Sequence, residues 1–170
     1  MALRRHSHLP GTELLPHFPR ARAWLTHREN LLFLAMIVLH LWPVWGYQYF
    51  PSQDGPAHLE SASIIRAYHD PQRSALRDYF VLNQDFTPNW AGHLVLAGLM
   101  AFMTPLLAEK AFLSGYVILL PLAVRYAVSA IRGNSAFLAF LVFPFVYNYP
   151  LHMGFYSFSY SLAAFFVVSG

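Results

Sequence analysis

An apolar segment that is long enough to cross a lipid bilayer constrains this chain more than any other feature. Residues 31–50 contain no Asp, Glu, Lys or Arg. In a helix, which rises about 1.5 Å per residue, about 20 residues span the roughly 30 Å hydrocarbon core of a membrane. A long leader precedes the segment, and the segment itself ends with the aromatic residues Trp45, Tyr47 and Tyr49. These flanks favour a retained membrane helix over a cleaved signal peptide.

The composition supports an integral membrane protein. Charged residues make up 11% of the chain and apolar residues 56%, whereas soluble domains carry about 25% charged residues. Cysteine is absent, which excludes disulfides and thiolate metal sites. The glycines lack the spacing of a Walker loop or a dinucleotide fingerprint, so a nucleotide-sugar enzyme is unsupported.

The positive charge orients the first membrane helix. Five arginines precede it: Arg4, Arg5, Arg20, Arg22 and Arg28. By the positive-inside rule this leader, residues 1–29, lies in the cytoplasm, and we expect it to be disordered. The charge is an orientation signal, so we expect no nucleic-acid partner. The loop at about 51–106 is then external, and residues 30–170 form a membrane module.

Two short helical patterns occupy the external loop. Asp54 precedes Gly55-Pro56 and is expected to cap a helix. Its apolar face is formed by Ala57, Ser61, Ile64, Ile65 and Tyr68. Asp70 precedes Pro71 in the same way, with a face formed by Ala75, Leu76, Tyr79 and Phe80. Helices with one apolar side are expected to lie in the membrane interface.

Two topologies compete for the rest of the chain. If residues 91–105 crossed the bilayer, the following span would leave Arg125 and Arg132 outside. If residues 91–105 instead lie in or re-enter the outer leaflet, both arginines reach the cytoplasm, as the positive-inside rule requires. Fifteen residues are also short for a span. We therefore predict spans at about 31–50, 107–130, 135–149 and 154–170.

The predicted fold is an all-α polytopic membrane helix bundle. It has about four transmembrane helices, interface helices in the first external loop, and a short re-entrant or interfacial segment. Residues 163–170 end the chain in apolar sequence. We therefore expect an N-terminal fragment of a longer protein, and one alternative is a truncated relic.

Asp54 is the strongest candidate for chemistry. At a helix N-terminus its carboxylate would be kept ionised by backbone N–H groups and the helix dipole, as a general base requires. His58, four residues on, projects to the same side and could hydrogen-bond Asp54 or share a divalent cation with it. Glu60 and Asp85 are the nearest further acids. Plain capping, a satisfied backbone carbonyl and solvated loop acids are the structural alternatives.

Two polar residues later in the chain are also candidates. His152 lies in residues 133–170, which contain no Asp, Glu, Lys or Arg. Polar groups at membrane depth are costly and tend to face cavities. In the chosen topology the turn that carries His152 emerges on the same side as Asp54. Asn148 is the weaker candidate, because it could merely satisfy the backbone that Pro150 leaves unpaired.

The order of these features is similar to that of the GT-C integral membrane glycosyltransferases. Residues 54–58 resemble the Asp-x-x-x-His opening of bacterial members, and residues 148–158 resemble their Asn…Gly-Phe-x-x-Phe stretch. The resemblance covers about 30–170. The chain departs from it where the familiar acid pair is stretched to Asp54 and Glu60, and where the later spans and C-terminal domain are missing.

The resemblance implies a bacterial inner-membrane enzyme with a cytoplasmic N-terminus. It would transfer a sugar from a polyprenyl-phosphate donor to an acceptor on the external face. Asp54 would be the catalytic base, with Mg²⁺ or Mn²⁺ as a cofactor shared with His58. The expected substrate-binding residues are His58, Glu60, Asp85, Asn148 and His152. The alternative is a noncatalytic membrane protein, either a transporter component or an assembly partner.

Overall fold

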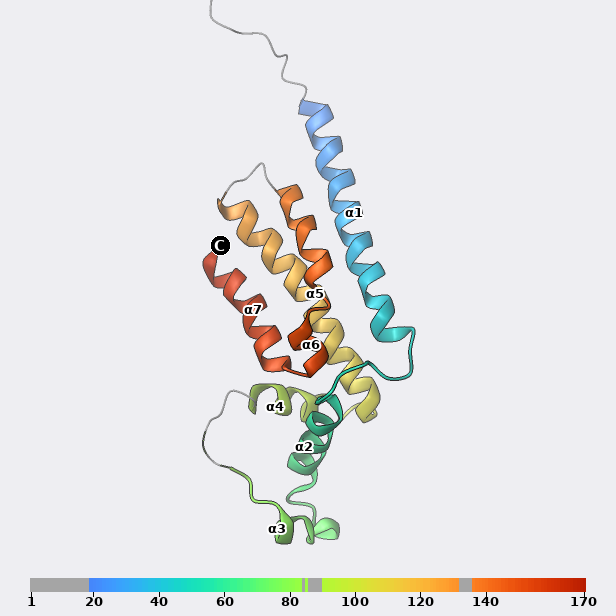
Figure 1. Ribbon diagram of the computed structural model, residues 1–170, viewed down its shortest axis with the longest axis vertical. Coiled ribbons are helices and arrows are strands. Elements are labelled where there is room, and N and C mark those ends of the chain that lie inside the picture. The colour runs from blue at the N-terminus through green and yellow to red at the C-terminus, as the bar shows by residue number, and fades with distance from the viewer. Residues whose placement is uncertain (1–18, 84, 86–89, 132–135) are drawn as a thin grey trace, which may run out of the picture.

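The computed structural model describes residues 19–83, 85, 90–131 and 136–170, with only the backbone described for 19–26. The described part of the chain is helical and contains no strand, which confirms the all-α prediction. Figure 1 shows the order of the elements. They are α1 (Pro19–Trp45), α2 (Gly55–Ala67), η1 (Pro71–Arg73), α3 (Leu76–Tyr79), α4 (Trp90–Leu99), α5 (Pro105–Ile131), η2 (Ala136–Phe145), α6 (Tyr149–Met153) and α7 (Tyr156–Ser169).

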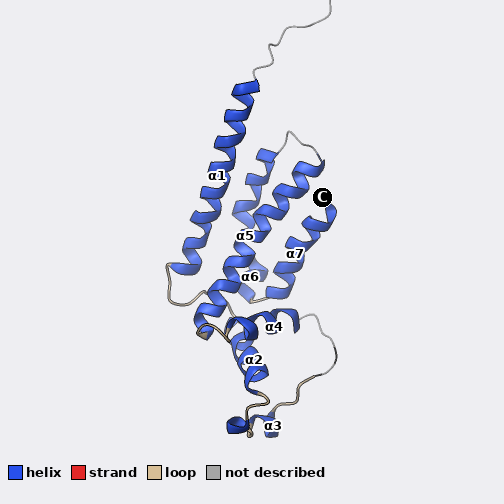
Figure 2. Cartoon of the chain, turned by 180° about the vertical axis from the view of Figure 1, so that it is seen from behind, coloured by secondary structure: helices blue, strands red, loops and turns tan. Residues whose placement is uncertain are grey.

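Four helices, α1, α5, η2 and α7, form a bundle in which α5 is central. α5 packs against α1, η2 and α7, and successive rods run in opposite directions (Figures 1 and 2). α5 supplies much of the buried core, including Phe112, Leu113, Tyr116, Val117 and Leu120. Its apolar residues recur on the sides that face its three neighbours, so this helix is held by packing rather than by propensity alone.

The long connection between α1 and α5 lies at one end of the bundle. It contains α2, η1, α3 and α4, and α4 lies across the bundle end rather than alongside it (Figure 1). At the opposite end, Arg125 of α5 pairs with Glu29 of α1, with 3.4 Å between its Nη2 and Oε1 of Glu29. Arg125 therefore shares an end with the start of α1, as in the topology that we chose.

One helix in the described residues is long and apolar enough to cross a bilayer by itself. It is α5, with 27 residues and a mean hydropathy of 1.7 in its best window. α4, η2 and α7 are apolar but shorter. At about 2.0 Å per residue in a 3₁₀ helix and 1.5 Å in an α-helix, η2 and α7 each span roughly 20 Å. The four-span bundle therefore stays a prediction.

The first helix begins and ends earlier in the chain than the apolar segment 31–50 predicts. α1 begins at Pro19 and ends at Trp45, whereas we expected a span over 31–50. The leader that was predicted to be disordered comprises residues 1–29. Its residues 19–29 lie in α1, and residues 1–18 lie outside the described residues.

Of the two helices predicted in the loop, the first is present as α2, whereas the second is divided into the short pieces η1 and α3, and only one of the two acids has the expected cap. Asp70 accepts a hydrogen bond from the backbone N–H of Gln72 at the start of η1. Asp54 occupies the N-cap position of α2, yet its side chain makes no capping hydrogen bond. The prediction that Asp54 caps this helix is therefore correct in position and wrong in chemistry.

Candidate functional site

The candidate site lies where the start of α2 meets the bundle. Two backbone hydrogen bonds join the linker before α2 to the last residues of α6. Gln53 N–H donates to the carbonyl of His152 over 2.8 Å, and Asp54 N–H donates to that of Met153 over 3.3 Å. Pro51 and His152, which lie 101 positions apart in the sequence, are thus brought together at this point.

Gly154 permits this close approach. It adopts a left-handed conformation with φ of 88°, which residues with a Cβ adopt at a cost. A Cβ at this position would lie 2.8 Å from Cβ of Asp54 and 3.0 Å from its backbone nitrogen. Glycine therefore lets the α6–α7 turn pack directly against Asp54.

Asp54 lines a groove that has both polar and apolar walls. We call this the Asp54 groove; it has a volume of about 500 Å³ and is lined by Asp54, His58, Gly154, Phe155, Ser157, Phe158 and Ser161. Asp54 is half-buried. Its carboxylate makes no hydrogen bond or ion pair with any residue that the structure describes. The group is thus held in the groove by its backbone and is available to a ligand.

His58 forms a histidine pair with His93 of α4. Its Nδ1 lies 2.9 Å from Nε2 of His93, and its Nε2 lies 2.8 Å from the carbonyl oxygen of Gly154. Since a carbonyl only accepts, Nε2 of His58 carries a proton and donates it to Gly154. In the neutral pair, His93 Nε2–H then donates to Nδ1 of His58.

The imidazole of His93 is biased toward its neutral form. Burial lowers the pKa of His93 below its ordinary value, and the neighbouring His58 lowers it further. Desolvation disfavours the charged imidazolium, and two like charges at hydrogen-bonding distance repel each other. His93 was not among the predicted site residues. Its presence in a short segment close to the external loop was the only sequence signal for it.

A buried acid lies beneath the start of α2. Glu109 of α5 is 5% exposed, and its Oε1 accepts a 2.8 Å hydrogen bond from the hydroxyl of Tyr156 on α7. A Cβ on Gly55 would lie 2.5 Å from that same oxygen. Glycine at position 55 therefore lets α2 sit directly on the Glu109–Tyr156 pair. Sequence reasoning missed Glu109, although an acid inside an apolar helix is itself a signal.

Two apolar grooves adjoin the Asp54 groove along the bundle. One, of about 420 Å³, shares Ser157 and Ser161 with it and runs between α4, α5 and α7, lined also by Ala91, Gly92, Val95, Phe112, Leu119, Tyr160 and Ala164. A second, of about 480 Å³, shares Phe158 with it. The site thus combines a polar end with apolar channels, which suits a ligand with a polar head and a hydrocarbon chain.

Four of the predicted site residues lie away from the Asp54 groove. Glu60 is exposed on α2, and Asp85 lines a separate hollow of about 600 Å³ beside Trp90. Asn148 caps α6 by accepting from the N–H of Leu151, and it donates to the hydroxyl of Tyr116. The structure thus places Asn148 in the structural role that we weighed as the alternative.

His152 also has a structural use. Its Nδ1 lies 3.0 Å from the carbonyl oxygen of Pro51, so the ring donates there. The same ring stacks on Phe50, with centroids 5.4 Å apart and planes inclined by 9°. His152 therefore reaches the same end of the molecule as Asp54, as predicted, but it fastens the linker there and does not line the groove.

The donor set does not fit a divalent cation. Mg²⁺ and Ca²⁺ require six or more oxygen ligands, of which several come from carboxylates or water. Within the described ranges, no three His, Cys, Asp or Glu side chains gather closely enough to hold a metal. Both ring nitrogens of His58 are already hydrogen-bonded. The expected Mg²⁺ or Mn²⁺ stays a prediction, and the reaction proposed for this site does not use it.

Comparisons of the chain with protein-family models, with curated proteins and with solved structures find no match. The resemblance to GT-C glycosyltransferases therefore rests on the residues and their order alone.

Proposed function

We propose that this chain acts as a GT-C-like membrane glycosyltransferase that uses a polyprenyl-phosphate sugar. The observation that carries the proposal is the carboxylate of Asp54. Asp54 lines a mixed polar and apolar groove and its side chain has no hydrogen-bond partner among the described residues, and apolar grooves adjoin this groove. A lipid-linked sugar has the matching distribution of polar and apolar groups.

Exposed apolar side chains support a membrane location for the bundle. On α1, Leu32, Val38 and Trp42 are 62%, 67% and 68% exposed. On η2, Leu141 and Phe145 are 68% and 67% exposed. Soluble monomers rarely expose apolar patches of this extent, whereas lipid covers them without cost. We therefore place the four rods across a bacterial inner membrane, with the N-terminus in the cytoplasm and the Asp54 groove at the outer face.

Two of the four helices that form the bundle are short for a membrane span. η2 and α7 are each shorter than the roughly 30 Å hydrocarbon core, and a bilayer thins locally around short helices at modest cost. The apolar groove between α4, α5 and α7 opens on the flank of the bundle. In this arrangement a prenyl chain reaches the groove from the lipid, while its sugar phosphate lies beside Asp54 and His58.

The reaction that fits is a single displacement with inversion at the sugar carbon. Asp54 accepts the proton of an acceptor hydroxyl, and the freed electron pair forms the new bond from the acceptor oxygen to the anomeric carbon. The bond from that carbon to the phosphate oxygen breaks, and polyprenyl phosphate leaves with the electron pair.

An Asp54→Asn variant of the full-length protein tests the role of Asp54. General-base catalysis contributes about 10²- to 10⁴-fold, so transfer from a radiolabelled polyprenyl-phosphate sugar should fall by at least about 10²-fold. Glu60→Gln is the matched control, because Glu60 lies on the same helix, is exposed and does not line the groove. Unchanged transfer by Asp54→Asn would remove Asp54 from the reaction.

One observation favours the noncatalytic alternative. His152 and Asn148 are both engaged in hydrogen bonds that hold the fold together. A membrane assembly partner needs such fastening and needs no base. Saturable binding of the lipid-linked donor, measured with the Asp54→Asn variant, separates the two functions. An enzyme retains donor binding when the base is lost, whereas an assembly partner shows none with either form.

A further inference from the structure

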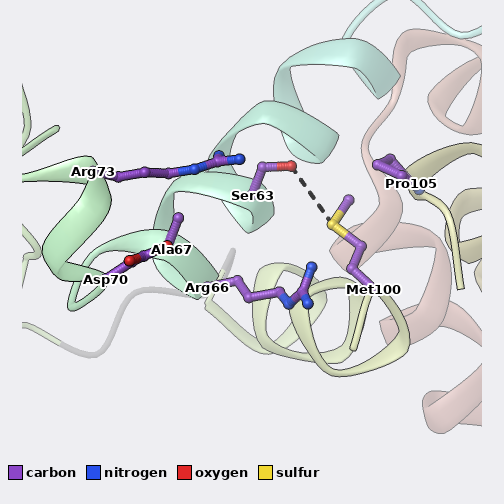
Figure 3. A pocket seen from close by; sticks show the side chains of 7 residues that line it. All are labelled: Ser63, Arg66, Ala67, Asp70, Arg73, Met100 and Pro105. Carbon is purple, nitrogen blue, oxygen red and sulfur yellow. Dashed lines mark hydrogen bonds between the residues drawn. The ribbon is translucent and has the colours of Figure 1, made fainter. Parts of the chain in front are cut away.

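A second polar hollow lies at the far end of α2, below the turn between α4 and α5. It measures about 370 Å³ and is lined by Ser63, Arg66, Ala67, Asp70, Arg73, Met100 and Pro105 (Figure 3). Arg66 is in the last turn of α2, and a helix rises about 1.5 Å per residue, so about 18 Å of helix separates it from Asp54. This hollow, the Arg66–Arg73 hollow, is distinct from the Asp54 groove.

Two guanidinium groups reach over this hollow from different elements. Arg66 comes from α2 and Arg73 from η1, and both side chains extend toward the side where Ser63 and Met100 lie (Figure 3). Both arginines are exposed. Neither guanidinium group makes a hydrogen bond or ion pair with a residue that the structure describes. Their donors are therefore directed to solvent or to a ligand.

The other polar groups of the hollow favour an anion. Ser63 donates its hydroxyl to the sulfur of Met100 over 3.7 Å, a weak acceptor that an anionic oxygen would replace readily. Asp70 is the single acid in the lining. It is occupied by its cap bond to the N–H of Gln72 and forms no ion pair with either arginine. The lining thus keeps a positive excess.

Solvation alone explains one exposed arginine but not this pair. Arg66 in a last helical turn is favoured by the helix dipole, whatever surrounds it. That effect does not bring Arg73, from a separate element, over the same hollow. Arginine binds phosphate through two parallel hydrogen bonds, and two guanidinium groups around a hydroxyl match the oxygens of one phosphate group.

We propose that the Arg66–Arg73 hollow binds a phosphate group, carried by a soluble phosphate compound or by the headgroup of an anionic lipid. Arg66 and Arg73 hold the phosphate oxygens, and Ser63 donates a further hydrogen bond. Met100 and Pro105 form an apolar wall beside it. The inference does not depend on glycosyl transfer, because no residue of the Asp54 groove takes part.

Calorimetric titration of inorganic phosphate into the full chain in uncharged detergent micelles tests the site. Hydrogen bonds to charged groups contribute about 1.5–3 kcal/mol, so Arg66→Gln and Arg73→Gln should each weaken binding about 10-fold or more. Arg77→Gln is the matched control. Arg77 lies nearby but outside the hollow, and its Nη1 donates to the carbonyl of Tyr68. This control should bind phosphate as the native chain does.

A second titration identifies the source of the phosphate. Phosphatidylglycerol or phosphatidylcholine is added to the micelles before inorganic phosphate. If phosphatidylglycerol weakens the binding of inorganic phosphate and phosphatidylcholine does not, the hollow binds an anionic headgroup. If neither lipid weakens it, the hollow binds a soluble phosphate. Circular dichroism checks that all variants keep their helix content. The absence of saturable phosphate binding, or equal weakening by Arg77→Gln, would overturn the proposal.

Discussion

At the scale of single residues, Asp54 and Asp70 show how backbone geometry decides the use of an acid before a helix. Asp70 has an extended backbone (φ −68°, ψ 120°), and its side chain caps η1. That conformation directs the side chain toward the first free N–H groups. Asp54 has φ −97° and ψ 0° and makes no capping bond. Contact with Gly154 holds Asp54 in this conformation, which leaves its carboxylate for the groove.

Gly154→Ala should destabilise the fold and displace Asp54. A left-handed conformation costs a residue with a Cβ about 1–2 kcal/mol, and the added carbon would press on Asp54. Gly98→Ala is the control, because a Cβ at position 98 meets no atom within 4 Å. Alanine inside a helix is favoured over glycine by about 0.5–1 kcal/mol. Thermal melting in micelles should therefore show a lower midpoint for the first variant and an equal or higher one for the second.

The histidine pair should make stability depend on pH. Because burial and His58 lower the pKa of His93, the folded chain binds fewer protons than the unfolded chain below the ordinary histidine pKa of about 6.5. Stability is therefore fully present above pH 6.5 and is lost as the pH falls through the lowered pKa. Melting temperatures between pH 8 and pH 5 should show this decline.

His93→Gln is the matched variant for that dependence. Glutamine retains a donor for Nδ1 of His58 but does not titrate in this range. The decline of the melting temperature below pH 6.5 should become shallower in this variant. An unchanged slope would assign the pH dependence to other groups.

At the scale of elements, α2 is positioned by contacts from the bundle rather than by its own sequence. Glu109 on α5 and Tyr156 on α7 meet under Gly55. The α6–α7 turn contacts the residue that precedes the helix. Three elements distant in the chain thus fix the start of α2, and with it the orientation of Asp54 and His58.

Tyr156→Phe should weaken this seating. The substitution removes the hydroxyl that donates to Glu109 and leaves a buried carboxyl group without that partner, which costs about 1–3 kcal/mol. Tyr126→Phe is the control on α5, because Tyr126 is 54% exposed. Chemical unfolding in micelles should show a loss for Tyr156→Phe alone. Equal losses would indicate a general effect of removing tyrosine hydroxyls.

At the scale of the whole molecule, the two ends of the bundle carry different groups. The end with α2, α3 and α4 holds the Asp54 groove and the Arg66–Arg73 hollow. The other end holds Arg125 beside Glu29. If the bundle spans a membrane, these two sets lie in different compartments.

Single cysteines at Val81 and Ile131 test that separation. The native chain has no cysteine, and these positions are 88% and 79% exposed at opposite ends of the bundle. A membrane-impermeant thiol reagent should label Val81→Cys in intact cells. It should label Ile131→Cys only after the membrane is opened. Labelling of both positions in intact cells would contradict the proposed topology.

The sequence by itself determined the helical character and most element positions. The helix at Gly55–Ala67, the break near Pro71 and the turn around Gly154 follow from local rules: glycine and proline placement and apolar periodicity. It also predicted that residues 91–105 lie in or re-enter the outer leaflet, which stays a prediction, and the structure places α4 across the end of the bundle. These signals act over a few residues and need no partner.

Only the tertiary structure decided which polar side chains meet. His58 pairs with His93 across 35 residues, and Tyr156 with Glu109 across 47. His152 and Asn148, which were also candidate site residues in the sequence, make hydrogen bonds that hold the fold together. The physical reason is that a hydrogen bond depends on distances of about 3 Å and on direction, and packing of distant helices sets both.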